Sequence, residues 1–406
     1  MEKSKAKTGS RFSKNRMRLA LLVFALLISG SYLESYTARV ILYNKVSIQD
    51  FKIFPQREIK NQEPPFIFPK KLSPELFGQI EYRSLSRVRR QSLDDLNASN
   101  QTSAFIVIQN DAILYENYFN GYRRDSLTTI FSVTKSFCSA LIGIAIDEGL
   151  IKSVDDPVIK YVPELKGRGL DELTIRHLLN MSSGIKYQEG WFPWVDEPKS
   201  YYEPDLRRLT LSVVWDGEPV GKYFHYNNYH PPLEGIILER VTGKTVSAYL
   251  EEKIWKPLGM EYPASFSLDS ETDGFEKLEG GLNARAIDLA KFGRLYLNRG
   301  NWNGKQIISE KWVLESTSPD PNDRRIWKSY PEFQAKNGYY KYHWWGRTKP
   351  EGSYDFLAIG NLGEYIYVCP KKNLIIVRLG KNYGLVDDWP DLFQTIAAEL
   401  PAISDP

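Results

Sequence analysis

Strand-like segments lie toward the two ends of this chain and helix-like segments fill its middle, and this order limits the folds open to it. Two β-rich runs, 103–108 and 112–117, flank a polar turn at 109–111, which predicts a hairpin. Strand character returns only after residue 339. The pattern predicts a mixed α/β (α+β) fold, with one antiparallel sheet built from the N- and C-terminal thirds, helices flanking it, and an inserted, mostly helical subdomain.

The helix-like middle begins near residue 132 and has one long interruption. Between 186 and 225 the chain is aromatic, contains proline and shows little periodicity. Residues 284–297 are amphipathic at helical spacing. We expect helices at 132–149, 173–179, 233–241, 284–297, 310–315 and 393–400, a short helix opened by Asp155, and strands at 339–345, 355–359, 365–369 and 374–379.

Positive charge is concentrated at the start of the chain. The formal net charge is +3, but residues 1–18 hold seven Lys or Arg and one Glu, so the remainder is net negative. A chain without a basic face beyond its tail does not resemble a nucleic-acid-binding protein. We therefore expect no nucleic-acid partner.

An apolar run follows the basic residues directly. Residues 19–33 are apolar apart from 29–32. A cationic segment followed by such a run is typical of an export signal or a signal-anchor, and the positive-inside bias places the rest of the chain outside the cytoplasm. We expect membrane association through an anchor at 17–36, with cleavage near 29–31 as the alternative, and an extracytoplasmic location in the periplasm or on the outer face of the cell membrane.

The chain divides into three parts on these grounds. Residues 1–36 form the basic tail and the signal peptide or signal-anchor. Residues 37–74 are punctuated by proline and are expected to be a connector that packs along the surface. Residues 75–400 are expected to be the catalytic domain. The oligomeric state is left open.

Cysteine and histidine usage gives no sign of a metal site. Only Cys138 and Cys369 occur, and we expect both to be buried free thiols, because one lies on an apolar helix and the other follows a strand. The four histidines are scattered, and no Cys/His group has metal-ligand spacing. We expect no metal and no cofactor.

A serine and a lysine three residues apart open the apolar helix at 132. Ser132 and Lys135 share one helical face, and the first turn of a helix offers free backbone N–H groups and the positive end of its dipole. A hydroxyl, an adjacent nitrogen base and amide donors are what acyl transfer through a serine requires. The spacing alone is common, since Ser4 and Lys7 in the basic tail share it, so the context decides.

A second candidate element is the segment from Tyr226 to Asn228. A phenol beside the serine and lysine can carry a proton between nucleophile and leaving group if its pKa is lowered or its proton is shared with Lys135. The Asn228 carboxamide can hold both the lysine and a substrate carbonyl. We expect Ser132, Lys135 and Tyr226 to converge around one small cavity.

In their order, Ser132-x-x-Lys135 and Tyr226-x-Asn228 resemble the motifs of the penicillin-recognising serine hydrolases related to class C β-lactamases. The resemblance covers 75–400 and implies a β-lactamase/transpeptidase-like sheet with the site in the cleft beside the helical subdomain. It also implies that Ser132 is the acylated nucleophile, Lys135 tunes it and Tyr226 carries the proton. Four longer stretches look like the same family, namely 155–163, 173–184, 233–243 and 280–290.

The third motif of that family, a Lys-Thr-Gly or His-x-Gly on a late strand, is altered here. Residues 360–364 occupy its place, and Asn361 stands where the cation is expected. Asparagine offers an anion only a neutral hydrogen bond, which is weaker than a charged one. The resemblance further implies that Gly363 completes the motif and that the backbone N–H groups of Ser132 and Glu364 form the oxyanion hole.

The missing cation favours amidase and esterase members over enzymes that bind a β-lactam or D-Ala-D-Ala carboxylate. The chain looks most like the subgroup of 6-aminohexanoate-oligomer hydrolases and related carboxylesterases. We expect an exported serine hydrolase that cleaves a small-molecule amide or ester through an acyl-enzyme on Ser132. A D,D-peptidase or weak β-lactamase is the alternative, and a non-catalytic binding relative is a third possibility. An apolar acyl pocket is expected from Trp191, Trp194, Trp344 and Trp345.

Overall fold

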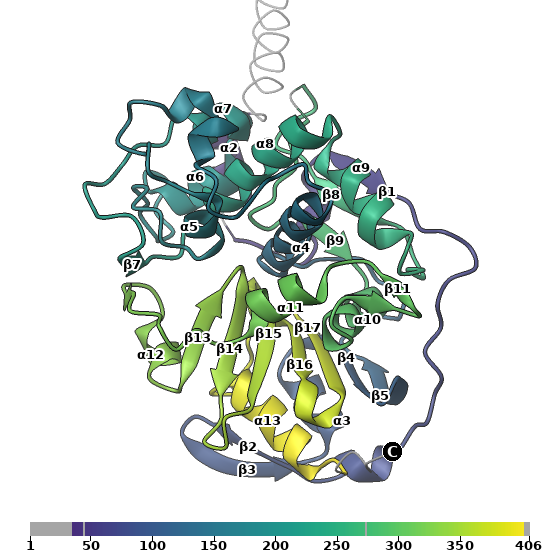
Figure 1. Cartoon of the computed structure of the whole chain (residues 1–406). Helices are drawn as coiled ribbons and strands as arrows, with labels where there is room; N and C mark the ends of the chain where they lie inside the picture. The colour runs from purple at the N-terminus through teal and green to yellow at the C-terminus, as the bar shows by residue number, and fades with distance from the viewer. Residues whose placement is uncertain (1–34, 44, 273, 402–406) are drawn as a thin grey trace, which may run out of the picture.

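A seven-stranded antiparallel sheet forms one half of the computed structural model, which describes residues 35–43, 45–272 and 274–401. Figure 1 shows the sheet below and a helical region above it. The strand order is β13-β14-β15-β16-β17-β4-β5, so two early strands lie beside five late ones, which confirms the predicted sheet. The strands are β4 (Thr102–Gln109), β5 (Ala112–Tyr118), β13 (Gly338–Lys341), β14 (Trp344–Thr348), β15 (Tyr354–Gly360), β16 (Glu364–Cys369) and β17 (Leu374–Gly380).

The sheet is buried on both faces, because successive residues of its central strands serve two different cores. Ile106 and Ile108 of β4 belong to one core, and Phe105 and Val107 belong to the other. This alternation follows from the two-residue period of a strand. The helices α4 (Val133–Asp147) and α10 (Ala286–Leu297) cover the face that belongs to the first core. The helices α3 (Leu93–Ser99) and α13 (Trp389–Glu399) cover the face that belongs to the second core.

The predicted hairpin between β4 and β5 is confirmed. Asn110 and Asp111 close it, with φ of 52° and 59°. Short polar side chains tolerate this left-handed conformation, and two such residues in succession match the twist of the flanking strands. The turn fixes the register that places Ile106 and Ile108 in the same core as α4.

Further helices lie between β5 and β13 and form most of the upper half of Figure 1. The helix α8 packs against α4 as well as its neighbours in this region, and Gly243 ends it with φ of 66°, as its sequence predicts. The bounds are α5 (Ile175–Leu179), α6 (Asp196–Tyr202), α7 (Leu206–Leu211), α8 (His230–Thr242), α9 (Val246–Leu250), α11 (Glu310–Thr317) and α12 (Pro331–Gln334).

A four-stranded sheet of order β1-β8-β9-β6 ties the segment 37–74 to the helical region. In this sheet β1 pairs antiparallel with β8, and α2 (Tyr36–Tyr43) packs on α6. Part of the segment is therefore built into the fold. The sheet consists of β1 (Gln56–Ile59), β6 (Thr128–Thr129), β8 (Ala264–Ser267) and β9 (Leu282–Ala284). Other strands form separate two-stranded pairs, which are β2 (Ile80–Ser84) with β3 (Arg87–Gln91), β7 (Tyr223–Phe224) with β12 (Ile326–Trp327), and β10 (Asn301–Trp302) with β11 (Lys305–Gln306).

The structure corrects two expected elements. The strand predicted at 339–345 is a hairpin, because the chain reverses at Tyr342 and His343, whose φ values are 44° and 63°. Neither residue is a Gly or Asn, so no turn signal marks this reversal in the sequence. The helix expected at Asp155 is a single 3₁₀ turn, Val158–Lys160.

The expected membrane anchor, 17–36, falls almost wholly outside the described residues. Within the ranges that the structure describes, no helix is long and apolar enough to cross a membrane.

Candidate active site

Ser132 lies in the tight turn that leads into α4. Phe131 precedes it with φ of 45°, and Ser132 has φ of −65° and ψ of −6°. Gly360, at the end of β15, lies against this turn, where an added Cβ would come within 2.5 Å of the Ile130 carbonyl oxygen. The sheet and the turn therefore meet backbone to backbone, and glycine permits that approach.

Lys135 is the hydrogen-bond partner of Ser132. Its Nζ donates to Ser132 Oγ at 2.7 Å and to the Glu279 backbone oxygen at 2.5 Å. The residue is 1% exposed, and burial lowers the pKa of Lys135 from 10.5 to about 7, although the Glu279, Glu197 and Glu234 carboxylates oppose the shift. An amine with a pKa near 7 is neutral in a large fraction of molecules at neutral pH and can then accept a hydroxyl proton.

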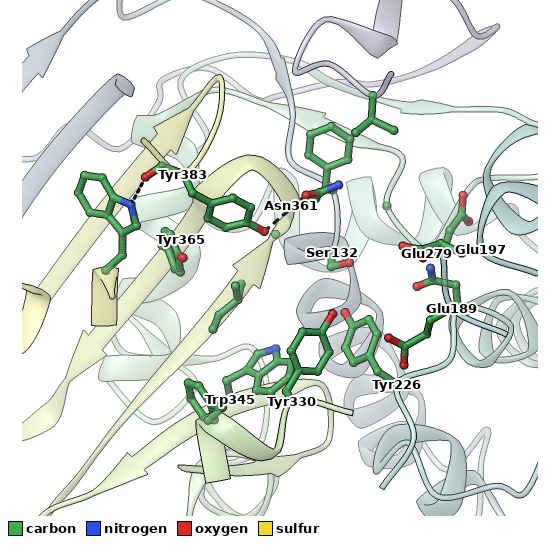
Figure 2. A pocket seen from close by; sticks show the side chains of 18 of the residues that line it. Ser132, Glu189, Glu197, Tyr226, Glu279, Tyr330, Trp345, Asn361, Tyr365 and Tyr383 are labelled. Carbon is green, nitrogen blue, oxygen red and sulfur yellow. Dashed lines mark hydrogen bonds between the residues drawn. The ribbon is translucent and has the colours of Figure 1, made fainter. Parts of the chain in front are cut away.

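Tyr226 reaches the same hydroxyl from the loop between β7 and α8. Figure 2 shows its hydroxyl pointing toward Ser132. Lys135 Nζ lies 5.0 Å from the centroid of its ring. Burial raises the pKa of Tyr226 well above 10, and Tyr330 acts in the same direction, while a hydrogen bond with Ser132 opposes the shift. The structure thus brings Ser132, Lys135 and Tyr226 together, with the phenol in its protonated form at neutral pH.

Asn228 lies in the wall of the same cavity, with part of its amide unpaired. Its Nδ2 donates to the Tyr187 hydroxyl at 3.0 Å, whereas its Oδ1 is buried and has no hydrogen-bond partner among the described residues. The structure does not contain the predicted hydrogen bond between Asn228 and Lys135, which both lie within the described residues. A buried acceptor without a partner costs about 1–3 kcal/mol, so Oδ1 is available to a donor on a bound molecule.

A cavity of about 860 Å³ opens beside Ser132. One wall is a cluster of aromatic rings, in which the centroid of Tyr226 lies 5.7 Å from that of Tyr330 and 5.8 Å from that of Trp345. Figure 2 shows these rings on one side of Ser132 and Asn361 on another. A cavity that combines aromatic rings with polar and charged groups is suited to binding a small molecule.

Of the altered motif at 360–364, only Gly360 and Asn361 line the cavity. Asn361 lines the cavity, and its Oδ1 accepts from the Leu362 backbone N–H at 2.8 Å. Gly363 and Glu364 do not line it, because Glu364 begins β16 with a fully buried side chain and the Gly363 carbonyl accepts from Arg378 at 2.5 Å. The hairpin turns these two predicted binding residues away from Ser132.

The four tryptophans expected in the acyl pocket are in different places. Trp191 and Trp345 line the cavity. Trp344 is fully buried against Phe292, at a ring-centroid distance of 5.9 Å, and Trp194 is exposed. Trp344 and Trp345 are neighbours on β14, so the alternation of a strand sends them to opposite faces.

Six of the described acidic residues line the cavity, and sequence reasoning found none of them. Glu189 and Glu197 belong to the aperiodic region before residue 225. Glu197 accepts from the Gly190 N–H at 2.8 Å, and burial raises the pKa of its carboxyl, with Glu189 acting in the same direction. No motif accompanies them, and an acidic residue in a stretch without apolar periodicity ordinarily indicates a solvated surface, although the structure places Glu197 in the first turn of α6.

The basic residues of the wall are already paired. Lys336 forms ion pairs with Asp388 and Asp391 at 2.6 and 2.9 Å, and Arg347 pairs with the same two carboxylates. Of the lining residues that the structure describes, none is an unpaired Lys or Arg that would meet a substrate carboxylate.

Comparisons with known proteins agree with this geometry. The family model described as Beta-lactamase matches residues 90–398. The 6-aminohexanoate-dimer hydrolase of Paenarthrobacter ureafaciens is 29% identical over 308 residues, which are 71% of this chain and 73% of that protein. A putative 6-aminohexanoate-dimer hydrolase from Bacillus anthracis has a similar structure, with a TM-score of 0.73, 24% identity and coverage of 87% of this chain and 92% of that one. A family VIII carboxylesterase shares the fold at a TM-score of 0.58 and 18% identity, over 76% of this chain and 95% of that one.

Proposed function

This chain belongs to the beta-lactamase family of serine hydrolases, and on that premise we propose that it cleaves an amide or ester bond of a small molecule through an acyl-enzyme on Ser132. The observation that carries the proposal is the 2.7 Å hydrogen bond between Lys135 Nζ and Ser132 Oγ, with Tyr226 at the same hydroxyl. A relative named for the hydrolysis of a 6-aminohexanoate dimer and a carboxylesterase of the same fold support this substrate class.

Acylation begins with Lys135 in its neutral form and Tyr226 in its protonated form. Neutral Lys135 takes the proton of Ser132 as Oγ attacks the carbonyl carbon, and the carbonyl becomes a tetrahedral oxyanion. Tyr226 then gives its proton to the leaving amine or alcohol as the C–N or C–O bond breaks, and it recovers a proton from Lys135. Both side chains return to their starting states, and the acyl group remains on Ser132.

Deacylation reverses the path with water as the nucleophile. Tyr226 accepts a proton from water while its own proton passes to Lys135, and the resulting hydroxide attacks the acyl carbonyl. When the bond to Ser132 breaks, Lys135 returns its proton to Oγ. The products are a carboxylic acid and the free enzyme.

We assign the two oxyanion donors to the backbone N–H groups of Ser132 and Asn361. Both residues line the cavity, and neither N–H has an acceptor within the described ranges. The sequence prediction placed the second donor at Glu364, but this residue pairs with Gly360 in the sheet and lies outside the cavity wall. A donor of this kind contributes about 2.7–4 kcal/mol to the transition state.

The charges of the cavity favour neutral or ammonium-bearing substrates. Glu189 and Glu197 lie in the wall, whereas Lys336 and Arg347 are paired. A β-lactam or D-Ala-D-Ala peptide carries a carboxylate, for which Asn361 supplies no positive charge. The family match supports a D,D-peptidase or weak β-lactamase as the alternative function.

We further propose that the enzyme works outside the cytoplasm, tethered to the membrane through 17–36. The basic residues before the apolar run support an orientation in which they stay in the cytoplasm and the chain after the run lies outside it. The tether itself lies almost entirely beyond the described part of the chain.

Turnover of a p-nitrophenyl ester and a matched anilide by the parent, Ser132→Ala and Ser136→Ala tests the assignment. Ser136 is a buried serine on the same helix whose Oγ donates to the His343 carbonyl, away from the cavity. We expect Ser132→Ala to lose at least about 1000-fold in kcat and Ser136→Ala to keep most of its activity. Turnover by the parent that equals that of Ser132→Ala and does not exceed the uncatalysed rate would favour a non-catalytic relative.

Labelled penicillin separates the two enzymatic functions. Rapid ester turnover without stable labelling is expected. Stoichiometric, long-lived labelling at Ser132 would instead favour the D,D-peptidase.

A further inference from the structure

Three large aromatic side chains stand exposed in one short loop. Trp191, Phe192 and Trp194 are 59%, 62% and 67% exposed, and the rings of Phe192 and Trp194 stack at 5.0 Å. We call this segment, 191–194, the aromatic loop. Contiguous exposed apolar groups of this size mark an interaction surface in soluble domains.

The aromatic loop is held next to α2. The Tyr36 hydroxyl donates to the backbone oxygen of Pro193, within the loop. One face of α2 packs into the protein, where Val40 lies in a small core with Phe54. The opposite face carries Ile41 and Leu42, which are 65% and 52% exposed. Two exposed apolar features, one on a loop and one on a helix, are therefore joined in one region.

The position of α2 in the chain indicates what this region meets. The apolar run 19–33 ends three residues before Tyr36. Three residues span at most about 11 Å when fully extended. If the run is anchored in a membrane, as the proposed function holds, the backbone of Tyr36 lies within that reach of the bilayer surface. The aromatic loop is connected to Tyr36 by the side-chain hydrogen bond to Pro193.

We propose that the aromatic loop and the outer face of α2 form a docking surface for the interface of a phospholipid bilayer. Tryptophan and phenylalanine beside aliphatic residues are the composition of membrane-interface belts, where the indole N–H meets headgroups and the rings meet acyl chains. The proposal rests on the proposed tether, which delivers this surface to the membrane and removes most of the entropic cost of association.

The docking surface also sets the position of the active-site cavity relative to the bilayer. Trp191 belongs to the aromatic loop and lines the cavity, and Val46, which follows α2, lines it as well. Contact with lipid therefore holds the rim of the cavity against the bilayer. The opposite end of the molecule carries β2 and β3, as Figure 1 shows, and this hairpin stays in water.

Fluorophores at two matched positions test the surface in the full chain, reconstituted in phosphatidylcholine vesicles. Phe192→Cys places a label in the aromatic loop, and Val88→Cys places one on β3, where the native side chain is 60% exposed. Cys138 and Cys369 are free but buried, so labelled parent protein supplies the blank. Soluble-ester turnover by both variants is expected to match the parent, which verifies folding.

Lipids carrying a nitroxide near the headgroup are expected to quench the label at 192 at least threefold more than the label at 88. Equal quenching of both labels in vesicles that retain the chain through an alkaline wash would overturn the docking surface and leave the tether intact. A chain that washes off the vesicles would overturn the tether, and the docking surface with it. Self-quenching of the label at 192 that grows with protein concentration in detergent would assign the surface to a second copy and would also overturn the proposal.

Discussion

Glu234 and His343 form a fully buried pair, with His343 Nε2 2.9 Å from Glu234 Oε2. His343 Nδ1 lies 2.9 Å from the Tyr340 hydroxyl, and Cys138 Sγ lies 3.2 Å from the same Glu234 oxygen. Through these contacts the imidazole bridges the Glu234 carboxylate and the Tyr340 phenol. The pair joins α8 to the turn between β13 and β14 and reaches α4 through Cys138.

Removing one member of this pair is expected to destabilise the protein more than removing both. His343→Gly suits the left-handed backbone at φ of 63° but leaves the Glu234 carboxylate buried without the imidazole, at a net cost of about 3 kcal/mol. Glu234→Leu in the same chain removes that charge and recovers most of the loss. Urea unfolding of the parent, both single variants and the double variant measures the coupling, and additive effects would contradict it.

The activity is expected to rise with pH through neutrality. Burial sets the pKa of Lys135 near 7, and only neutral lysine accepts the serine proton. Below that pKa, kcat/KM for a neutral ester therefore falls about tenfold per pH unit, and above it a plateau extends until Tyr226 ionises. The midpoint belongs to the coupled group of Ser132, Lys135 and Tyr226. A profile that is flat between pH 5 and 8 would contradict the role of Lys135.

The buried Lys135 is expected to lower the free energy of unfolding by an amount that depends on pH. Its pKa is lower in the folded chain than in the unfolded chain, so the unfolded state binds more protons between about pH 7 and 10.5. The free energy of unfolding of the parent therefore increases with pH in this window, by up to about 1.4 kcal/mol per unit from this group. Lys135→Met loses activity and lacks that slope. Parallel pH curves for the two proteins, measured by urea unfolding, would show that Lys135 is not the buried amine described.

Glu197 is expected to set the preference for positively charged substrates. Glu197→Gln keeps the shape of the cavity wall and removes a partly buried charge, so kcat/KM for an ammonium-bearing ester falls about tenfold while that for its uncharged isostere changes little. Glu332→Gln, at an exposed position of the same wall, is the matched control. A loss that is equal for both esters would assign Glu197 a structural role.

The sheet and the candidate catalytic residues could be predicted from the sequence because strong local signals mark them. Short apolar, β-rich runs predicted β4, β5, β15, β16 and β17, and the apolar helix after Ser132 marked the proposed nucleophile. The proximity of Tyr226 and Lys135, which lie far apart in sequence, was predicted from the order of the motifs. In the structure Lys135 Nζ lies 5.0 Å from the centroid of the Tyr226 ring.

Other parts of the site depend on geometry that no local pattern encodes. Asn361 and Glu364 are three residues apart in one hairpin, and only the turn between β15 and β16 decides that Asn361 lines the cavity. Glu197 lies in the first turn of α6, within a stretch whose sequence shows no apolar periodicity, so nothing in the sequence separates it from a solvated acid. The reversal at Tyr342 and His343 contains no glycine to mark it, and the His343 imidazole contacts the buried Glu234 carboxylate there.

The most direct test of the central claim is to locate the covalent adduct on the protein. We expect one equivalent of a fluorophosphonate to react per chain, peptide mapping by mass spectrometry to place it on Ser132, and Lys135→Met to slow the labelling at least about 100-fold. An adduct on another residue, or sustained ester turnover by fully labelled protein, would contradict the account.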